Sequence, residues 1–270
     1  MLAIQINSLN LLFYICVAEK NKRLSKRQCK KMQINGSAMQ TIAILNSKGG
    51  SGKTTISLNL ASFYAETGYS TVLIDYDSQG SSTFWVSTRA EQQPSIYCIP
   101  AYQQSARLTR SFQMRLPSGS ERVIIDTPAA VTHRQLEEIT NRSNFIIIPV
   151  LPSSIDIHAA SGFIEQLSRL NRVRRGEAKL AVVASRVNAN TKIYSALEEY
   201  LHNTDIPFVA KIRDTQNYIH AINEGKGLFE VYPPHKVARD LADWYPLINW
   251  IEQKEMFPEQ ESEQPLVQAV

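Results

Sequence analysis

The sequence predicts an α/β fold with a mainly parallel sheet that is covered by helices on both faces. Short apolar runs alternate with helical patterns from residue 39 to about residue 250. A glycine-rich loop separates the first apolar run from the first long helix, and acidic residues directly follow two later runs. Continuous apolar strands are typical of parallel sheets buried on both faces. Ligands bind at the carboxyl ends of such strands, where the loop and the acidic residues fall.

Most elements have a clear local signal. The glycine-rich loop leads into a helix at residues 53–68, whose apolar positions recur at helical spacing and which Gly68 ends. The stretch at 79–117 is polar and less regular, so short helices are expected there. The run at 171–176 is expected to be a basic loop. Strands are expected at residues 42–45, 71–74, 123–125, 145–150, 180–184 and 207–210, and further helices at 154–171, 191–203, 214–224 and 236–253.

Charge and composition divide the chain into three parts. Residues 1–38 carry seven of the 29 Lys and Arg residues and only one acidic residue, whereas the rest has a small acidic excess. This basic extension is interpreted as a flexible tail or as sequence upstream of a true start at Met39. The alternative is a basic arm that binds nucleic acid or an anionic surface. Residues 39–253 are expected to form one α/β domain, and the acidic tail at 254–270 is expected to be disordered.

The composition is that of an ordinary globular protein, with 43% hydrophobic and 20% charged residues in a chain of 270. The three cysteines, Cys16, Cys29 and Cys98, show no metal-binding or disulfide spacing. No run is long and apolar enough for a transmembrane helix, and the apolar run at 9–18 lacks the flanks of a signal peptide. A cytoplasmic protein without a membrane partner is expected.

Residues 46–55 read Asn-Ser-Lys-Gly-Gly-Ser-Gly-Lys-Thr-Thr, which is the pattern of a phosphate-binding loop between a strand and a helix. Glycines allow successive backbone N–H groups to converge on one anion, and the helix N-terminus adds partial positive charge. Lys53 is expected to reach the β- and γ-phosphates of a nucleotide, and the Thr54 hydroxyl to complete the shell of a Mg²⁺ ion. The weaker interpretation is a Gly/Ser turn beside chance lysines.

The loop departs from the usual spacing G-x-x-x-x-G-K-[ST], because position 47 is serine and glycines stand at 49 and 50. It resembles the deviant Walker A motif of the ParA/MinD family of dimerising P-loop ATPases. The resemblance implies that ATP is bound by Lys48, Gly49, Gly50, Ser51, Gly52, Lys53, Thr54 and Thr55. It also implies a catalytic role for Lys48, which in the family crosses the dimer interface to touch the partner's nucleotide.

Two acidic motifs extend the resemblance. Asp75 and Asp77 stand in a segment similar to the family motif D-x-D-P-Q-G, with Ser78 where proline is common. Asp77 lies 24 residues beyond Lys53, the family offset for the catalytic aspartate that orients the attacking water. The resemblance further implies that Asp126, in the Walker B sequence D-T-P-A, and Asp75 support the Mg²⁺ shell together with Thr54. Taken alone, Asp75 and Asp77 could instead cap a helix or lie in a solvated turn.

The sequence is most similar to small ParA-type plasmid partition proteins. This implies a nucleoid-associated ATP hydrolase. It would form a homodimer with ATP, bind DNA non-specifically, and be released when a ParB-like protein or a cargo adaptor stimulates hydrolysis. Positioning of another cargo, such as carboxysomes, is the alternative. A membrane-cycling MinD-like regulator would need a basic amphipathic C-terminal helix, but the chain ends in an acidic segment with a proline. An iron–sulfur ATPase would need cysteines beyond residue 98, and there are none.

The DNA and base contacts are less clear from the sequence. Candidate DNA contacts are the basic residues Arg172, Arg174, Arg175, Lys192, Lys211, Arg213, Lys236 and Arg239, although each alone is typical of a solvated surface. Asn190 and Asn217 stand where larger relatives often have arginine. By resemblance, the base and ribose of the nucleotide contact residues 186–188 and 212–214.

Overall fold

The computed structural model describes residues 39–103, 109–188 and 206–253, and these contain one seven-stranded sheet. All strand pairs are parallel, in the order β3-β2-β4-β1-β5-β6-β7. The strands are β1 (Gln40–Ile44), β2 (Thr71–Asp75), β3 (Ile96–Pro100), β4 (Arg122–Asp126), β5 (Phe145–Val150), β6 (Lys179–Val187) and β7 (Phe208–Arg213). The predicted parallel-sheet, P-loop α/β class is confirmed. The two tails, Lys192 and the helix expected at 191–203 lie outside the described residues.

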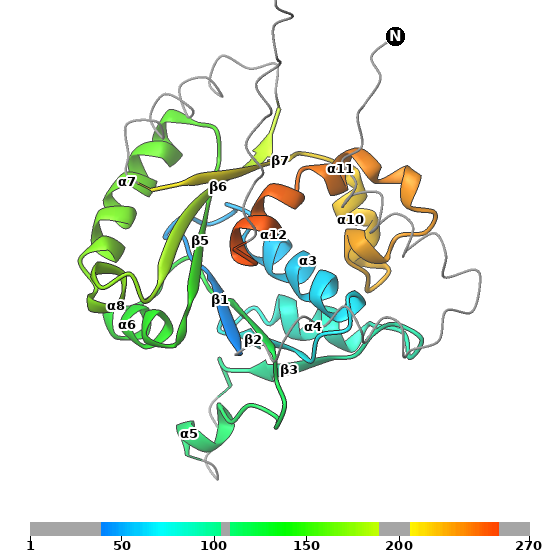
Figure 1. Ribbon diagram of the computed structural model, residues 1–270, viewed down its shortest axis with the longest axis horizontal. Coiled ribbons are helices and arrows are strands. Elements are labelled where there is room, and N and C mark those ends of the chain that lie inside the picture. Colours follow the sequence, from blue (N-terminus) through cyan, green and yellow to red (C-terminus); the bar gives the residue numbers. More distant parts are fainter. Residues whose placement is uncertain (1–38, 104–108, 189–205, 254–270) are drawn as a thin grey trace, which may run out of the picture.

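Helices cover both faces of the sheet (Figure 1). One face packs against α3 (Lys53–Glu66), α4 (Ser81–Ser87), α10 (Gln216–Asn223), the 3₁₀ turn η3 (Leu228–Glu230), α11 (Ala238–Ala242) and α12 (Tyr245–Ile251). Near the other face lie α5 (Arg110–Gln113), α6 (His133–Arg142), α7 (Ser154–Ser168) and α8 (Asn171–Arg174). Along β1, Ile42 and Ile44 join the first core, whereas Ala43 joins the second. No helix in the described ranges is long and apolar enough to cross a bilayer.

Strand β3 was not predicted from the sequence. It lies at the edge of the sheet, beside β2 alone. Ile96 and Ile99 are buried, but the side chain of Tyr97 is 54% exposed. The apolar run of this strand is only four residues long, at 96–99, and one of its side chains faces solvent, so it is shorter and less buried than the central strands. The polar residues around it made the whole stretch resemble irregular structure.

The final helix expected at 236–253 is also corrected. It is divided into a 3₁₀ turn η4 (Pro234–Lys236) and the helices α11 and α12. Pro246 lies in the first turn of α12, where a missing N–H costs nothing. A proline ring clashes with the carbonyl four residues earlier, so a helix continuing from α11 would be broken here. The expected loop at 171–176 contains the single helical turn α8.

A buried ion pair ties the end of α12 to the sheet. Arg122, the first residue of β4, is 1% exposed and lies 3.2 Å from a carboxylate oxygen of Glu252. The guanidinium also lies over the ring of Tyr69, at 4.0 Å from its centroid. Because β4 runs from Arg122 to Asp126, this pair lies at the amino end of the sheet, opposite the end that carries the glycine-rich loop.

Candidate nucleotide-binding site

The glycine-rich loop has the backbone that a phosphate cradle requires. Gly50 and Gly52 have φ angles of 75° and 91°, a region that other residues rarely enter. A Cβ atom on Gly52 would lie 2.5 Å from the Ser185 hydroxyl, so the position also lacks room for a side chain. Gly52 precedes the first turn of α3, and no side chain of the described chain caps that helix. The N–H groups of the first turn therefore face the loop, where an anion can accept them.

Asn46 holds the start of the loop in place. Its side chain is buried and donates from Nδ2 to the carbonyl of Pro149 at 2.6 Å. Its Oδ1 accepts from the backbone N–H of Lys48 at 2.9 Å. Ser51 then donates from its hydroxyl to the Lys48 carbonyl at 3.2 Å. These hydrogen bonds attach the phosphate-binding loop to β5.

Lys53 lies inside the loop that precedes it. The residue is 7% exposed, and its Nζ donates to the carbonyl of Lys48 at 2.9 Å. Burial lowers the pKa of Lys53, while the nearby carboxylates of Asp126 and Asp77 oppose that shift. Lys53 is therefore within electrostatic range of both acidic motifs, as the sequence predicted. Its ammonium group can exchange the carbonyl for phosphate oxygens without leaving the loop.

Asp126 is one of two fully buried carboxylates in the site. It is fully buried and accepts hydrogen bonds from the hydroxyls of Ser82 at 2.7 Å and Ser57 at 3.1 Å, as well as from Thr54. Burial raises the pKa of Asp126 to about 6, although the three hydroxyls oppose the shift. One carboxylate beside a threonine hydroxyl fits Mg²⁺, which keeps most of its waters and binds few protein ligands.

Asp75 and Asp77 occupy different environments. Asp75 is fully buried, and its oxygens accept from the backbone N–H and hydroxyl of Thr83 at 2.8 and 2.9 Å and from the Asp77 N–H at 3.0 Å. Burial raises the pKa of Asp75 despite these donors. Its carboxylate therefore positions the loop and the first turn of α4, and its predicted part in the Mg²⁺ shell stays a prediction. Asp77 is half-buried and accepts from the N–H of Gln79 at 3.0 Å.

Lys48 lies at the surface of the loop. Its side chain is 43% exposed, and Nζ is 3.6 Å from a carboxylate oxygen of Asp156 in the first turn of α7. Ser153 caps this helix by accepting from the N–H of Asp156. Lys48 therefore stands where a second molecule could reach it, whereas Lys53 does not. Its contact with a partner's nucleotide stays a prediction.

Sequence reasoning missed the side chains that surround these residues. Ser57 lies one helical turn after Lys53, so it could have been found from the spacing alone. Ser82 lies five residues after Asp77 of the first acidic motif and gave no signal of its own. Asp156 is distant in sequence from every motif, and only the fold brings it to the loop.

The two segments expected to contact the base lie side by side. Val187, near the end of β6, is paired with Arg213 at the end of β7, and the N–H of Asp214 donates to the Val187 carbonyl at 3.2 Å. The Arg213 guanidinium is held by Asp243, with bonds of 2.7 and 2.8 Å. The base and ribose contacts of these segments stay predictions.

A glycine cradle, a buried lysine and a carboxylate with hydroxyl neighbours, gathered at one edge of a parallel sheet, define a P-loop nucleotide-binding protein. The chain belongs to the CobQ/CobB/MinD/ParA nucleotide-binding domain family, whose model matches residues 42–229. The predicted ParA/MinD membership is therefore confirmed.

Named relatives and solved structures agree with this assignment. Maintenance of carboxysome distribution protein A of Halothiobacillus neapolitanus is 26% identical over 204 residues, which cover 74% of this chain and 91% of the relative. The Cyanothece McdA(D38A)–ATP complex aligns with a TM-score of 0.61 at 20% identity, covering 83% of this chain and all of that one. A Borrelia burgdorferi B31 putative plasmid partition protein bound to AMPPNP gives a TM-score of 0.60 at 18% identity, with 81% and 100% covered. At these identities the solved structures support the fold alone.

Proposed function

We propose that the chain is a Mg²⁺-dependent ATPase that dimerises with ATP and positions a cargo along DNA. The observation that carries this proposal is that two lysines of one loop lie in different environments. Lys53 is buried within the cradle, whereas Lys48 is exposed at its rim. A site whose second lysine faces outward is suited to completion by another copy of the chain, which couples hydrolysis to assembly.

The residues of one subunit have separate tasks in this reaction. Bound Mg·ATP supplies the phosphoanhydride bond that is cleaved and a cation that neutralises its oxygens. The N–H groups of the loop and the ammonium group of Lys53 hold the phosphates. Thr54 and Asp126 would hold the cation, while Asp77, just beyond the end of β2, would orient the attacking water. Lys48 of the second subunit adds positive charge where negative charge develops.

The role of Asp77 is tested by Asp77→Ala. The variant should bind Mg·ATP with an affinity close to that of the wild type, because the loop and Lys53 are untouched. It should hydrolyse ATP far more slowly and therefore accumulate as a dimer. Sedimentation with ATP and a phosphate-release assay measure both effects. A variant that stays monomeric with ATP, or that turns over normally, contradicts the role given to Asp77.

The basic residues expected to bind DNA are not equivalent in the fold. Arg213 is no longer a candidate DNA contact, because Asp243 accepts two hydrogen bonds from its guanidinium. Lys211 lies near the ring of Phe208 and is exposed. Lys236 and Arg239 are exposed on η4 and α11. We propose that these last two residues form the centre of the DNA-binding face.

The arginines at 172, 174 and 175 belong to another side of the molecule. Helix α8, which carries Arg172 and Arg174, lies on the opposite side of the sheet from α11 (Figure 1). Arg172 donates to the carbonyl of Asn141 at 2.9 Å, and Arg175 lies 3.7 Å from Glu177. A single DNA segment bound at α11 would not reach them.

Gel shifts with chains beginning at Met39 test the DNA-binding proposal without the basic extension. A dimer doubles every phosphate contact, so binding should require ATP, ignore DNA sequence and weaken steeply with salt. Removing Lys236 and Arg239 together by alanine substitution should abolish the shift, whereas the matched pair Arg174→Ala and Arg175→Ala should preserve it. If the Met39 chain does not bind DNA with ATP at low salt, the extension at 1–38 becomes the better candidate.

The cargo follows from the relatives only as a proposal. One relative is named for carboxysome distribution, and one similar structure is a putative plasmid partition protein. The sequence similarity to the carboxysome relative spans most of both chains, so a protein body is as good a candidate as a plasmid. In both cases an adaptor must recognise the ATP dimer and stimulate hydrolysis. Co-purification with the product of the neighbouring reading frame distinguishes the two: a DNA-binding adaptor indicates a plasmid or chromosome, and a shell-binding adaptor indicates a protein body.

A further inference from the structure

Helix α4 touches the nucleotide site at one end and the loop at 225–230 at the other. Its first turn supplies Ser82, which donates to Asp126 at 2.7 Å, and Thr83, which donates to Asp75 from both its N–H and its hydroxyl. The helix has seven residues, so its two ends are only about 10 Å apart at 1.5 Å per residue. A helix this short moves as one body.

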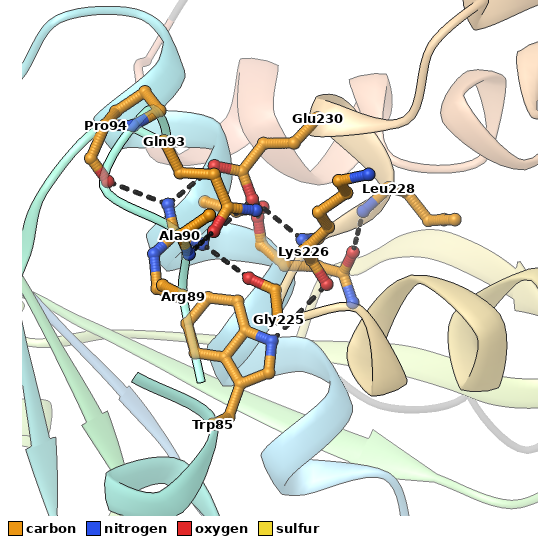
Figure 2. A network of polar contacts seen from close by, with 12 residues as sticks. Trp85, Arg89, Ala90, Gln93, Pro94, Gly225, Lys226, Leu228 and Glu230 are labelled. Atoms are coloured by element: carbon orange, nitrogen blue, oxygen red, sulfur yellow. Dashed lines mark hydrogen bonds and ion pairs between the residues drawn. The ribbon is translucent and has the colours of Figure 1, made fainter. Parts of the chain in front are cut away.

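Beyond its last turn, a buried ion pair fastens α4 to that loop. Arg89 donates to both carboxylate oxygens of Glu230, at 2.9 and 2.6 Å, and the two side chains are 6% and 4% exposed. The same guanidinium donates to the carbonyls of Gly225 at 3.2 Å and Pro94 at 2.7 Å. Figure 2 shows Arg89 at the centre of these contacts. The planar fork of arginine matches a carboxylate in a way that lysine cannot.

Further contacts pack α4 closely against the loop at 225–230. The indole of Trp85 is 2% exposed, and its Nε1 donates to the Lys226 carbonyl at 3.4 Å (Figure 2). A Cβ atom on Gly225 would lie 2.7 Å from the carbonyl oxygen of Thr88. The backbones of the two segments are thus in direct contact, and a shift of one must displace the other.

The loop also rests on α3, the helix that leaves the phosphate cradle. The N–H of Leu228 donates to Oδ1 of Asn59 at 2.8 Å, and a Cβ atom on Gly227 would lie 1.8 Å from the Ser62 hydroxyl. The loop directly follows α10 and precedes the segment that carries Lys236 and Arg239. Both helices that contact the nucleotide site therefore converge on one short loop beside the proposed DNA-binding face.

We propose that the ion pair between Arg89 and Glu230 couples the nucleotide site, through α4, to the proposed DNA-binding face around Lys236 and Arg239. The inference rests on the proposed function, in which a cation binds Asp126. The Ser82 hydroxyl and a cation then share one carboxylate, so cation binding shifts the first turn of α4. Arg89 passes this shift to the loop at 225–230. A contiguous chain of contacts of this kind is the physical basis of coupling between sites, and coupling factors of about 5 to 150 are typical.

Hydrogen exchange of the Leu228 amide tests the coupling directly. In the wild type, saturating Mg·AMPPNP should change its exchange rate by at least about fivefold. Arg89→Lys and Glu230→Gln each break the bidentate pair, and should reduce that response to less than about twofold at saturating nucleotide. Glu252→Gln is the matched control, because it breaks the buried pair with Arg122 at the amino end of the sheet; it should keep the full response while lowering stability.

Each outcome decides the proposal. The proposal is overturned if Mg·AMPPNP does not change the exchange rate of the Leu228 amide in the wild type. This result counts even if the variants fail to fold. Variants that retain the full response also overturn it, because the signal then passes through α3 and Asn59 alone. DNA affinity with and without AMPPNP is measured in parallel. If the wild type never binds DNA but its Leu228 amide responds through Arg89, the proposed function fails and the coupling stands.

Discussion

Removing the buried charge of Asp126 should stabilise the protein without nucleotide and weaken its response to Mg·ATP. The carboxylate is fully buried, and burial raises its pKa from 3.8 to about 6. A shift of roughly two units corresponds to about 3 kcal/mol between the protonated and the ionised form. Asp126→Asn keeps the shape of the side chain and removes the charge, and the hydroxyls of Ser57 and Ser82 can turn to accept from its amide.

The pH dependence follows from the direction of the shift. Because the pKa is higher in the folded state, the folded protein binds more protons than the unfolded chain between pH 4 and pH 6. The contribution of Asp126 to stability is therefore present below about pH 4 and is lost as the pH rises through 6. At pH 8 the asparagine variant should be more stable than the wild type by about 1–3 kcal/mol, or about 2–10 °C in melting temperature. At pH 5 the difference should shrink.

Urea unfolding at pH 8 and pH 5, with and without Mg·ATP, measures these differences. Mg·ATP should stabilise the wild type strongly and the variant weakly, since the variant lacks the carboxylate that holds the cation. Asp77→Asn is the matched control: it removes an equal charge from a half-buried loop carboxylate and should change stability little. An Asp126→Asn variant that is less stable than the wild type at pH 8 without nucleotide would refute the reasoning, because the hydroxyls would then outweigh the cost of burial.

Three further substitutions test the site and its scaffold. Lys53→Ala should abolish nucleotide binding. ATP at 100 times the wild-type Kd stabilises the wild type by about 2.7 kcal/mol, but it should no longer shift the melting temperature of the variant. Unchanged ATP affinity would contradict the site assignment. Gly52→Ala should lose both stability and ATP binding, since its φ of 91° and the Ser185 hydroxyl at 2.5 Å exclude a Cβ atom, and a normal melting curve would count against the cradle geometry. Gly162→Ala, exposed within α7 with no atom near its Cβ position, should raise stability by about 0.5–1 kcal/mol in thermal melts; a loss of stability there would reveal a contact that the fold does not show.

The buried strands and the phosphate loop were predictable because their signals are local. Strands β1, β2, β4 and β5 are continuous apolar runs, and the loop at 46–55 is recognised from ten adjacent residues. The edge strand β3 was missed because its apolar run at 96–99 is only four residues long and lies within a polar stretch. The break between α11 and α12 could have been predicted from Pro246, since proline excludes a continuous helix.

The contacts between distant segments could not be predicted in this way. Arg89 and Glu230 are 141 residues apart, and nothing in either segment indicates the other. Ser82 is one serine among several after Asp77, and only the packing of α4 brings its hydroxyl to Asp126. Sequence motifs identify groups that bind a common ligand. The side chains that orient those groups depend on the fold and cannot be identified from a local motif.

The surface around Lys48 supports the second copy of the chain that the proposed mechanism requires. Ile155, next to Asp156 in the first turn of α7, is 72% exposed. Covering such a side chain contributes about 1–2 kcal/mol per subunit, and a symmetric dimer covers two. Drawing Lys48 away from Asp156 costs less than about 1 kcal/mol, because the ion pair is 3.6 Å long and its lysine is 43% exposed. A dimer that uses this face therefore gains more from Ile155 than it loses at Lys48, which leaves the lysine available to the nucleotide of its partner.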